Sequence, residues 1–213
     1  MRYVPSGIFG MAVVAVGLAA NVESSCLGVI VGVTGAGQIV APPPSLMSGV
    51  FANSTVVYAI NEKQNALFNG VIDKYLPAVG VPYVLGSATP VNPGPLRVNS
   101  HILHFDNRFQ PQAGIVTGTA TFDKAIIGVI FTAARLNASD AALGNPGTVY
   151  PFGWANRGFS NVIDTFTLVN PFTIRFTLAN GSDMDQIRVL TVPAPGTLAG
   201  GCRLALFARR RRG

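Results

Sequence analysis

The chain has 213 residues, of which 49% are hydrophobic and 11% are charged, enough for one domain with a substantial core. It contains 24 Gly and 15 Pro but Glu only at Glu23 and Glu62, so the composition favours strands and turns over long charged helices. The net charge of +6 comes from the chain ends, because outside Arg2, Arg203 and Arg209 to Arg212 the basic and acidic residues balance. The missing basic stripe argues against nucleic-acid binding.

The N-terminal segment has the grammar of a secretory signal. Arg2 precedes an apolar stretch at residues 8–20, which is followed by small and polar residues. The stretch is shorter than the roughly 20 apolar residues that a membrane span needs. We therefore predict a signal peptide at residues 1–24, with the cleavage position left open.

Residues 27–191 alternate with period two and are interrupted by turn residues about every eight to fifteen positions, a spacing that is typical of a β-sandwich. In the last alternating segment we expect Ile187 and Val189 to face inward and Gln186 and Arg188 to face outward. The fold class predicted is all-β, a single jelly-roll-like antiparallel β-sandwich with short helical turns. The expected strands are 28–33, 55–61, 98–105, 115–122, 125–132, 164–169, 172–178 and 186–191.

Helical structure is expected only as short turns. Residues 139–144 predict a turn capped by Ser139 that ends at Gly144, and residues 62–68 are a second candidate. The proline-rich segments 42–44 and 86–95 are predicted to be loops, because proline removes the donors that a strand ladder needs.

The two histidines of the chain, His101 and His104, fall on one predicted strand. Residues three apart on a strand point to opposite faces, so they are not expected to hold one metal ion together. His104 and Asp106 are expected to share a face of the strand. Two such residues more often form a hydrogen-bonded polar pair without a function, and a functional site is the alternative.

Residues 150–159 concentrate aromatic side chains beside an amide and a guanidinium. Sugars are bound by aromatic faces flanked by such polar groups, so this loop is the candidate carbohydrate-binding site. The alternative is that the rings close one end of the sandwich and fill the core. The candidate residues are Tyr150, Phe152, Trp154, Asn156 and Arg157.

Acidic residues give only weak signals. Asp183 and Asp185 follow a turn and are calcium candidates, although a solvated hairpin tip is the more usual reason for such residues. Glycoside hydrolysis needs two carboxylates, and the spacing of the Asp residues singles out no pair. A G-x-S-x-G nucleophile turn does not occur in the sequence. No catalytic residue and no cofactor are therefore predicted.

Residues 192–213 carry a Pro-x-Pro break, a short apolar stretch and four consecutive arginines. This tail resembles the PEP-CTERM sorting signal of Gram-negative bacteria that make exopolysaccharide. The resemblance implies export through the secretion machinery, transient inner-membrane retention and removal of the tail by an exosortase-type transpeptidase. The sorting motif comprises Val192, Pro193, Ala194, Pro195, Arg209, Arg210, Arg211 and Arg212, with Ala194 in place of the usual Glu.

The middle of the chain also resembles exported proteins of no known activity that carry this type of tail. The resemblance implies a jelly-roll-like sandwich and points to no activity. The residues behind it are 61–64, 98–106, 121–123, 126–130, Leu136, 139–140 and 185–191.

These observations predict a non-enzymatic protein that is secreted or held at the cell surface, associated with the exopolysaccharide matrix in a structural or adhesive role. One alternative is a carbohydrate-binding module that uses the 150–159 loop. A second alternative is a hydrolase acting on the matrix polymer. Cys26 and Cys202 lie in or beside the segments expected to be removed, so no structural disulfide between them is predicted.

Overall fold

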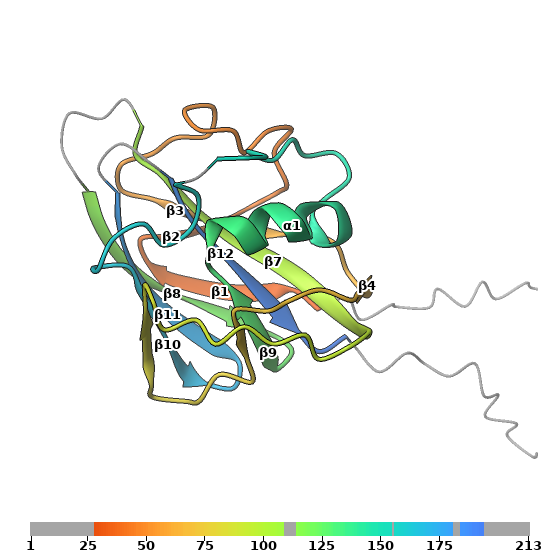
Figure 1. Ribbon diagram of the computed structural model, residues 1–213. Coiled ribbons are helices and arrows are strands. Elements are labelled where there is room, and N and C mark those ends of the chain that lie inside the picture. Colours follow the sequence, from red (N-terminus) through yellow and green to blue (C-terminus); the bar gives the residue numbers. More distant parts are fainter. Residues whose placement is uncertain (1–27, 109–113, 155, 181–183, 194–213) are drawn as a thin grey trace, which may run out of the picture.

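The structure is a computed structural model that describes residues 28–108, 114–154, 156–180 and 184–193. It consists of two packed β-sheets with one helix on the outside (Figure 1). The five-stranded sheet has the order β1 (Ile30–Gly35), β8 (Gly114–Phe122), β11 (Thr173–Asn180), β10 (Thr165–Asn170) and β6 (Pro82–Val84).

The second sheet, of seven strands, contains the longest strand, β7, at its centre. Its order is β2 (Gly37–Val40), β3 (Val57–Asn61), β7 (Leu96–Asp106), β12 (Met184–Thr191), β9 (Ile126–Ile130) and β5 (Lys74–Tyr75), with β4 (Ala66–Phe68) also pairing with β7. Only β2 and β3 pair in parallel; the other strand pairs of the described chain are antiparallel. The successive strands β7, β8, β9 and β10 alternate between the two sheets, as in jelly rolls.

The main core lies between the two sheets, because the period-two alternation sends every second side chain of each strand into this layer. Phe131, Phe159 and Phe166 form an aromatic group within it, with ring centroids 4.9 to 6.2 Å apart. Other members of this core come from both sheets and include Leu103, Phe105, Phe122, Phe176, Ile187 and Val189.

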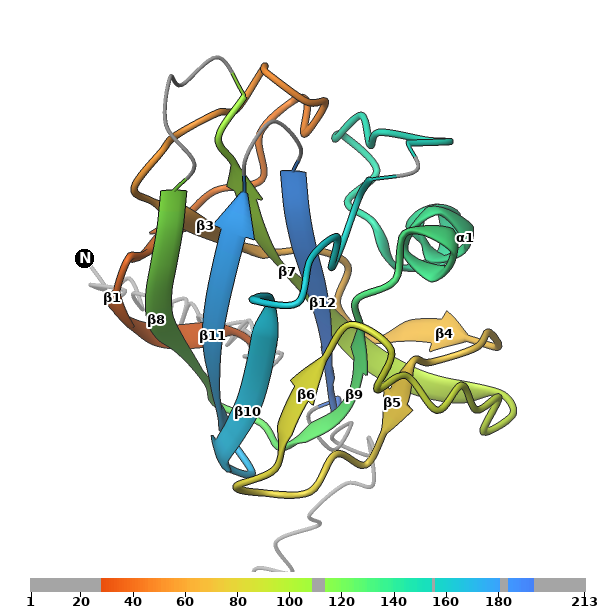
Figure 2. The ribbon, with the colours of Figure 1, turned by 60° about the vertical axis from the view of Figure 1, so that its left-hand side comes forward.

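The outer faces of the two sheets differ. Threonines line the outer face of the five-stranded sheet and bond across strands, at 2.7 Å for Thr34 with Thr119 and 3.1 Å for Thr117 with Thr177. The outer face of the seven-stranded sheet is instead covered by α1 (Ala133–Leu143) and by loops, as Figure 2 shows. All eight residues of β12 are consequently buried.

The predicted all-β sandwich is confirmed, and each of the eight expected strands overlaps an observed one. Both proline-rich segments lie outside the helices and strands. The short strands β2, β4, β5 and β6 were not predicted, and residues 62–68 contain β4 rather than a helical turn, so that prediction is wrong. The predicted helical turn does end at Gly144, but the helix begins at Ala133 and Ser139 lies inside it.

The orientation predicted for β12 is right on one face only. Ile187 and Val189 point into the core, whereas Gln186 and Arg188 are fully buried on the other face instead of exposed. The reason is that α1 covers this face, so polar side chains that would meet water on a half-buried strand meet protein groups here.

The first and last described residues lie at the same end of the sandwich. The backbone N–H of Val29 donates to Asp123 at 2.7 Å, and that of Val192 donates to the carbonyl of Ala125 at 2.9 Å. Of the predicted sorting motif, Val192 and Pro193 are described; the signal peptide, Ala194, Pro195 and Arg209 to Arg212 lie outside the described residues. No helix within the described part of the chain is long and apolar enough to cross a membrane.

Candidate functional site

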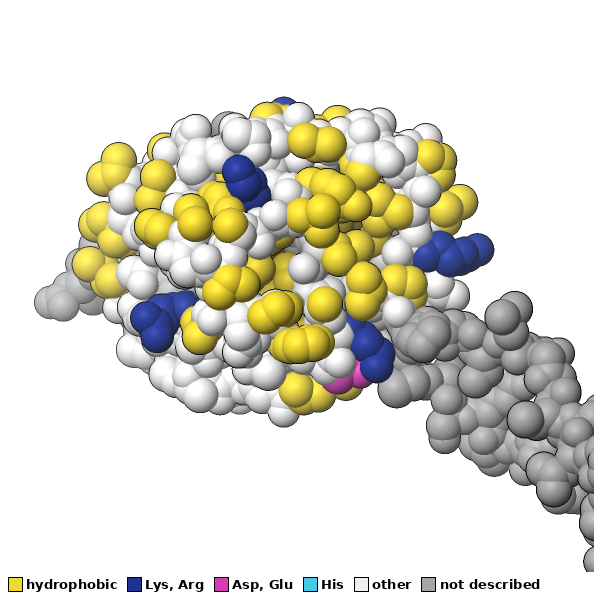
Figure 3. Space-filling view, turned by 90° about the horizontal axis from the view of Figure 1, so that it is seen from below, with side chains coloured by type: hydrophobic (Ala, Val, Ile, Leu, Met, Phe, Trp, Pro, Cys, Tyr) yellow, Lys and Arg dark blue, Asp and Glu magenta, His cyan; other side chains and the backbone are white. Residues whose placement is uncertain are grey.

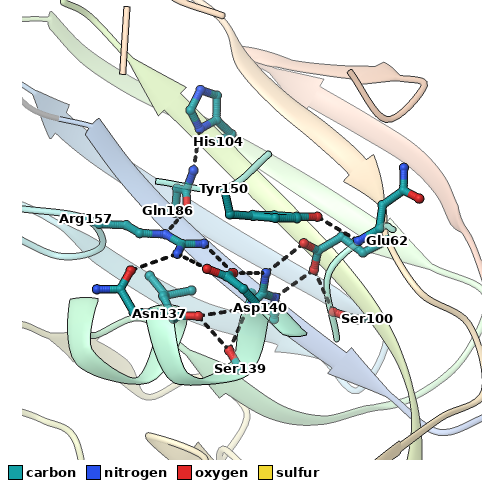
Figure 4. Close-up of polar contacts among 12 residues, drawn as sticks. Glu62, Ser100, His104, Asn137, Ser139, Asp140, Tyr150, Arg157 and Gln186 are labelled. Carbon is teal, nitrogen blue, oxygen red and sulfur yellow. Dashed lines mark hydrogen bonds and ion pairs between the residues drawn. The ribbon is translucent and has the colours of Figure 1, made fainter. Parts of the chain in front are cut away.

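A network of buried charges, which includes Glu62, Asp140 and Arg157, lies between β12 and α1 (Figure 4). Arg188 of β12 makes most of its contacts. Its guanidinium donates to Glu62 through Nε at 2.7 Å and Nη2 at 2.8 Å, and to Ser139 through Nη1 at 2.6 Å. Nη2 also donates to Asp140 at 2.9 Å. Ser100 donates to Glu62 at 2.7 Å, so the carboxylate is well satisfied without water.

Arg157 joins the network from the loop that follows α1. Its Nη1 and Nη2 grip the carboxylate of Asp140 at 2.5 and 2.8 Å, and Nη1 also donates to Asn137 at 3.0 Å. The bidentate geometry is the strong form of an arginine–carboxylate pair. Asp140 therefore bridges two arginines and ties α1 to both β12 and the 150–157 loop.

Two arginines and two carboxylates make the network electrically neutral. Burial alone would lower the pKa of Arg188, but the charges of Glu62 and Asp140 outweigh it and hold that pKa above its ordinary value. Arg188 thus stays charged inside the protein, at a position where an uncompensated charge would be very costly.

Gln186 extends the network to His104. Arg157 donates from Nε to Oε1 of Gln186, so the amide NH2 of Gln186 faces Nδ1 of His104, at 2.8 Å. Since an arginine has no acceptor, the Gln186 amide has one orientation, and Nδ1 of His104 must accept. The ring is therefore held neutral with its proton on Nε2. Burial lowers the pKa of His104 to about 4, and the charge of Arg157 acts in the same direction.

His101 points to the opposite face of β7, as the spacing predicted. Its ring lies 4.8 Å from that of Phe122, in the main core, and its nitrogens contact Asn61 at 2.8 Å and Thr191 at 3.2 Å. Burial lowers the pKa of His101 to about 3. Asp106 is occupied by backbone N–H groups of Gly49 and Arg108, so the sandwich uses it to hold loops.

The ring of Tyr150 covers the two arginines of the network. Its ring is 5.6 Å from the Arg188 guanidinium carbon and 5.7 Å from that of Arg157, close enough for cation–π attraction. Its hydroxyl accepts the backbone N–H of Asn145 at 2.8 Å. Burial and the neighbouring charge of Glu62 raise the pKa of Tyr150, so the phenol stays protonated.

A glycine lets the loop that carries Arg157 pass close to the end of β9. Gly158 has φ of +93°, and a Cβ there would lie 2.4 Å from the carbonyl oxygen of Phe131. The chain can therefore pass tightly over the end of β9 and deliver Arg157 to the network.

Tyr150 also lines an open pocket of about 410 Å³, a volume within the range of small-molecule sites. Tyr150 and Phe152 give it two aromatic rings, and Phe152 is 85% exposed. Lys63, Asn137, Asn145 and Thr148 contribute polar groups to the lining, which also contains Asp140. Aromatic faces with a few polar groups beside them are the general composition of a small-molecule site.

The structure brings together only part of the residue set proposed from the sequence. Tyr150 and Phe152 line the pocket, and Arg157 lies beneath it in the buried network. Trp154 does not line the pocket and lies instead against Arg108, whose guanidinium carbon is 5.4 Å from the ring. Asn156 is exposed and is also outside the lining. Lys63, Asn137, Asn145 and Thr148 were not predicted; Lys63 and Asn137 come from distant segments, and Asn145 and Thr148 from the turn before Tyr150.

The aspartates weighed for calcium binding or hydrolysis lie in different surroundings. Asp123 holds the first described residues, and Asp140 is engaged by two arginines. Asp164 and Asp185 both contact Ser160 but are fully buried. Asp183 lies outside the described residues. Among the described side chains, no three from His, Cys, Asp and Glu are grouped to hold a metal ion.

No protein-family model, curated protein or solved structure matches the chain. The site therefore has to be interpreted from its own geometry.

Acid is expected to destabilise the fold through the two histidines. Both have folded-state pKa values far below the value of about 6.5 expected in the unfolded chain, so the unfolded state takes up protons first. The contribution of the two neutral histidines to the free energy of unfolding is fully present above pH 6.5. It falls as the pH drops towards 4, by about 1.4 kcal/mol per pH unit for each histidine. Urea unfolding between pH 7 and pH 5 measures this slope. His104→Gln should remove about half of it, and a stability independent of pH over this range would contradict the assignment.

Proposed function

We propose that the protein is an exported, non-enzymatic component of the cell surface or exopolysaccharide matrix, and that its sandwich attaches to a polysaccharide through the pocket of Tyr150 and Phe152. The observation that carries the binding part is the pocket itself, with one fixed ring and one exposed ring beside polar side chains. The export part rests on the sequence of the two chain ends.

The electrostatics of the pocket favour a neutral or acidic sugar. Asp140, the acidic residue of the lining, is already paired with Arg157 and Arg188, so it is poorly placed to bind a cationic group. Lys63 is the lining residue with a positive charge. Hydroxyl or carboxylate groups of a matrix polysaccharide would therefore find donors at the rim.

The hydrolase alternative is less well supported. Glu62 and Asp140 are the two carboxylates nearest the pocket, and both are tied to Arg188. Glu62 is also buried, beyond the reach of a glycosidic oxygen in the pocket. The geometry favours binding.

Phe152→Ala is expected to weaken polysaccharide binding about tenfold, because covering an exposed Phe side chain contributes on the order of 1.5 kcal/mol and about 1.4 kcal/mol is a factor of ten in Kd. Glycan-array binding or affinity electrophoresis with matrix polysaccharide measures the effect. The exposure of Phe152 makes the variant safe for folding.

Trp154→Ala is the matched control, since it removes an aromatic ring from the same loop but outside the pocket lining, and it should bind as the unchanged protein does. Unaltered binding by Phe152→Ala, or equal loss in both variants, would remove the pocket from consideration.

Export and processing have a separate test. Protein recovered from the culture medium of a native producer should have an intact mass that lacks the residues before about Leu27 and after about Pro195. Those are the segments that the signal and the sorting tail would lose. A mass that retains Arg209 to Arg212 would contradict the sorting proposal.

A further inference from the structure

The end of the sandwich from which the chain enters and leaves is here called the exit end. Val29 and Val192 are held there by the turn between β8 and β9, at Asp123 and Ala125. The turn between β10 and β11 lies beside it, because the N–H of Ile126 donates to the carbonyl of Pro171 at 2.8 Å. The loop between β5 and β6 completes the exit end, through Leu76 bonded to Ile127 and Gly80 bonded to Leu168.

Large apolar side chains are exposed at the exit end. Leu76, Val79, Val81, Val169 and Phe172 are between 42% and 61% exposed. Figure 3 shows hydrophobic side chains spread over the face seen from below, with separate Lys and Arg side chains among them and very little acidic surface. Exposed apolar side chains with basic side chains among them are suited to a partner that has an apolar interior and a negatively charged surface layer.

Exposed apolar residues alone do not distinguish this end. Ile115, Val162 and Ile163, near the opposite end, are between 45% and 82% exposed. What distinguishes the exit end is the chain that continues from it. Leu198, where the apolar part of the tail begins, is the fifth residue after Pro193, and five residues span at most about 18 Å. An inserted tail would hold this end of the sandwich close to the lipid.

The charge of the described surface agrees with an anionic partner. Five of the carboxylates that the structure describes are buried, and the side chains of Asp123 and Asp140 are 22% and 13% exposed. Asp123 is in addition paired with Lys124 at 3.4 Å. Negatively charged headgroups would therefore meet little repulsion at the exit end.

We propose that the exit end docks on the surface of a phospholipid bilayer containing anionic lipid while the tail is retained, with Leu76, Val79 and Phe172 entering the headgroup region. The proposal rests on the proposed function, because it takes the tail as the tether. It assigns an orientation: the pocket of Tyr150 and Phe152 is not part of the docked surface and stays open to a polysaccharide.

The test uses the full chain with Cys26→Ser and Cys202→Ser, synthesised in the presence of vesicles of phosphatidylethanolamine and phosphatidylglycerol. One version carries Val79→Cys at the exit end and the matched control carries Val162→Cys near the opposite end, each labelled with an environment-sensitive dye. Both positions are exposed, so neither label disturbs the core. Vesicle cosedimentation, dye emission and quenching by a lipid-attached quencher are measured.

Cosedimentation with a blue-shifted, strongly quenched label at position 79 and an unshifted label at position 162 is the expected result. Cosedimentation with equal signals at the two positions, or with neither label shifted, would overturn the orientation and leave tail retention intact. Failure to cosediment would overturn both. In phosphatidylcholine vesicles the shift at position 79 should shrink, and an undiminished shift would overturn the requirement for anionic lipid.

Discussion

The burial of Arg188 is the constraint on which the outer face of the seven-stranded sheet depends. A charged guanidinium in the middle of β12 is tolerable only if opposite charges and hydrogen-bond acceptors surround it completely. Glu62 comes from the segment after β3, Asp140 and Ser139 come from α1, and Ser100 on β7 supports Glu62. Satisfying one side chain thus fixes the positions of several elements at once.

The candidate binding site follows from the same arrangement. Asp140 connects Arg188 to Arg157, and the two arginines together support the ring of Tyr150. A fixed Tyr150 leaves Phe152 exposed beside it, and the pocket opens between this loop and α1. The proposed ligand site is therefore a consequence of how the charges are buried, while the proposed membrane contact uses the other end of the molecule.

The strands could be predicted because alternation with period two is a local property of the sequence. Strands of two or three residues such as β5 and β6 leave no such pattern, and they were missed. The predicted orientation of Gln186 and Arg188 was wrong for a non-local reason, because the helix that covers them and the partner Glu62 lie far away in the sequence. The start of α1 is also set from a distance: buried Asp73 accepts the N–H groups of Phe131 and Thr132 and pairs with Arg135 at 3.2 Å.

The site was predictable to the extent that aromatic residues cluster in one loop. Tyr150 and Phe152 were found in this way, but the same clustering included Trp154, whose ring turns to Arg108 instead. The polar lining comes from Lys63, from Asn137 on α1 and from the turn containing Asn145, and no spacing in the sequence connects them. Only the folded arrangement shows which residues share the pocket.

Hydrogen exchange on the Arg188→Met variant tests most directly whether the buried charges hold α1 in place, with Arg175→Met on the exposed sheet face as the control. We expect the amides of α1 and of the 150–152 segment to lose protection by at least about 100-fold more than those of β8 and β11, because removing one partner of a buried ion pair costs about 3 to 5 kcal/mol where its partners lie. Equal loss of protection throughout the sandwich, or no loss in α1, would contradict this expectation.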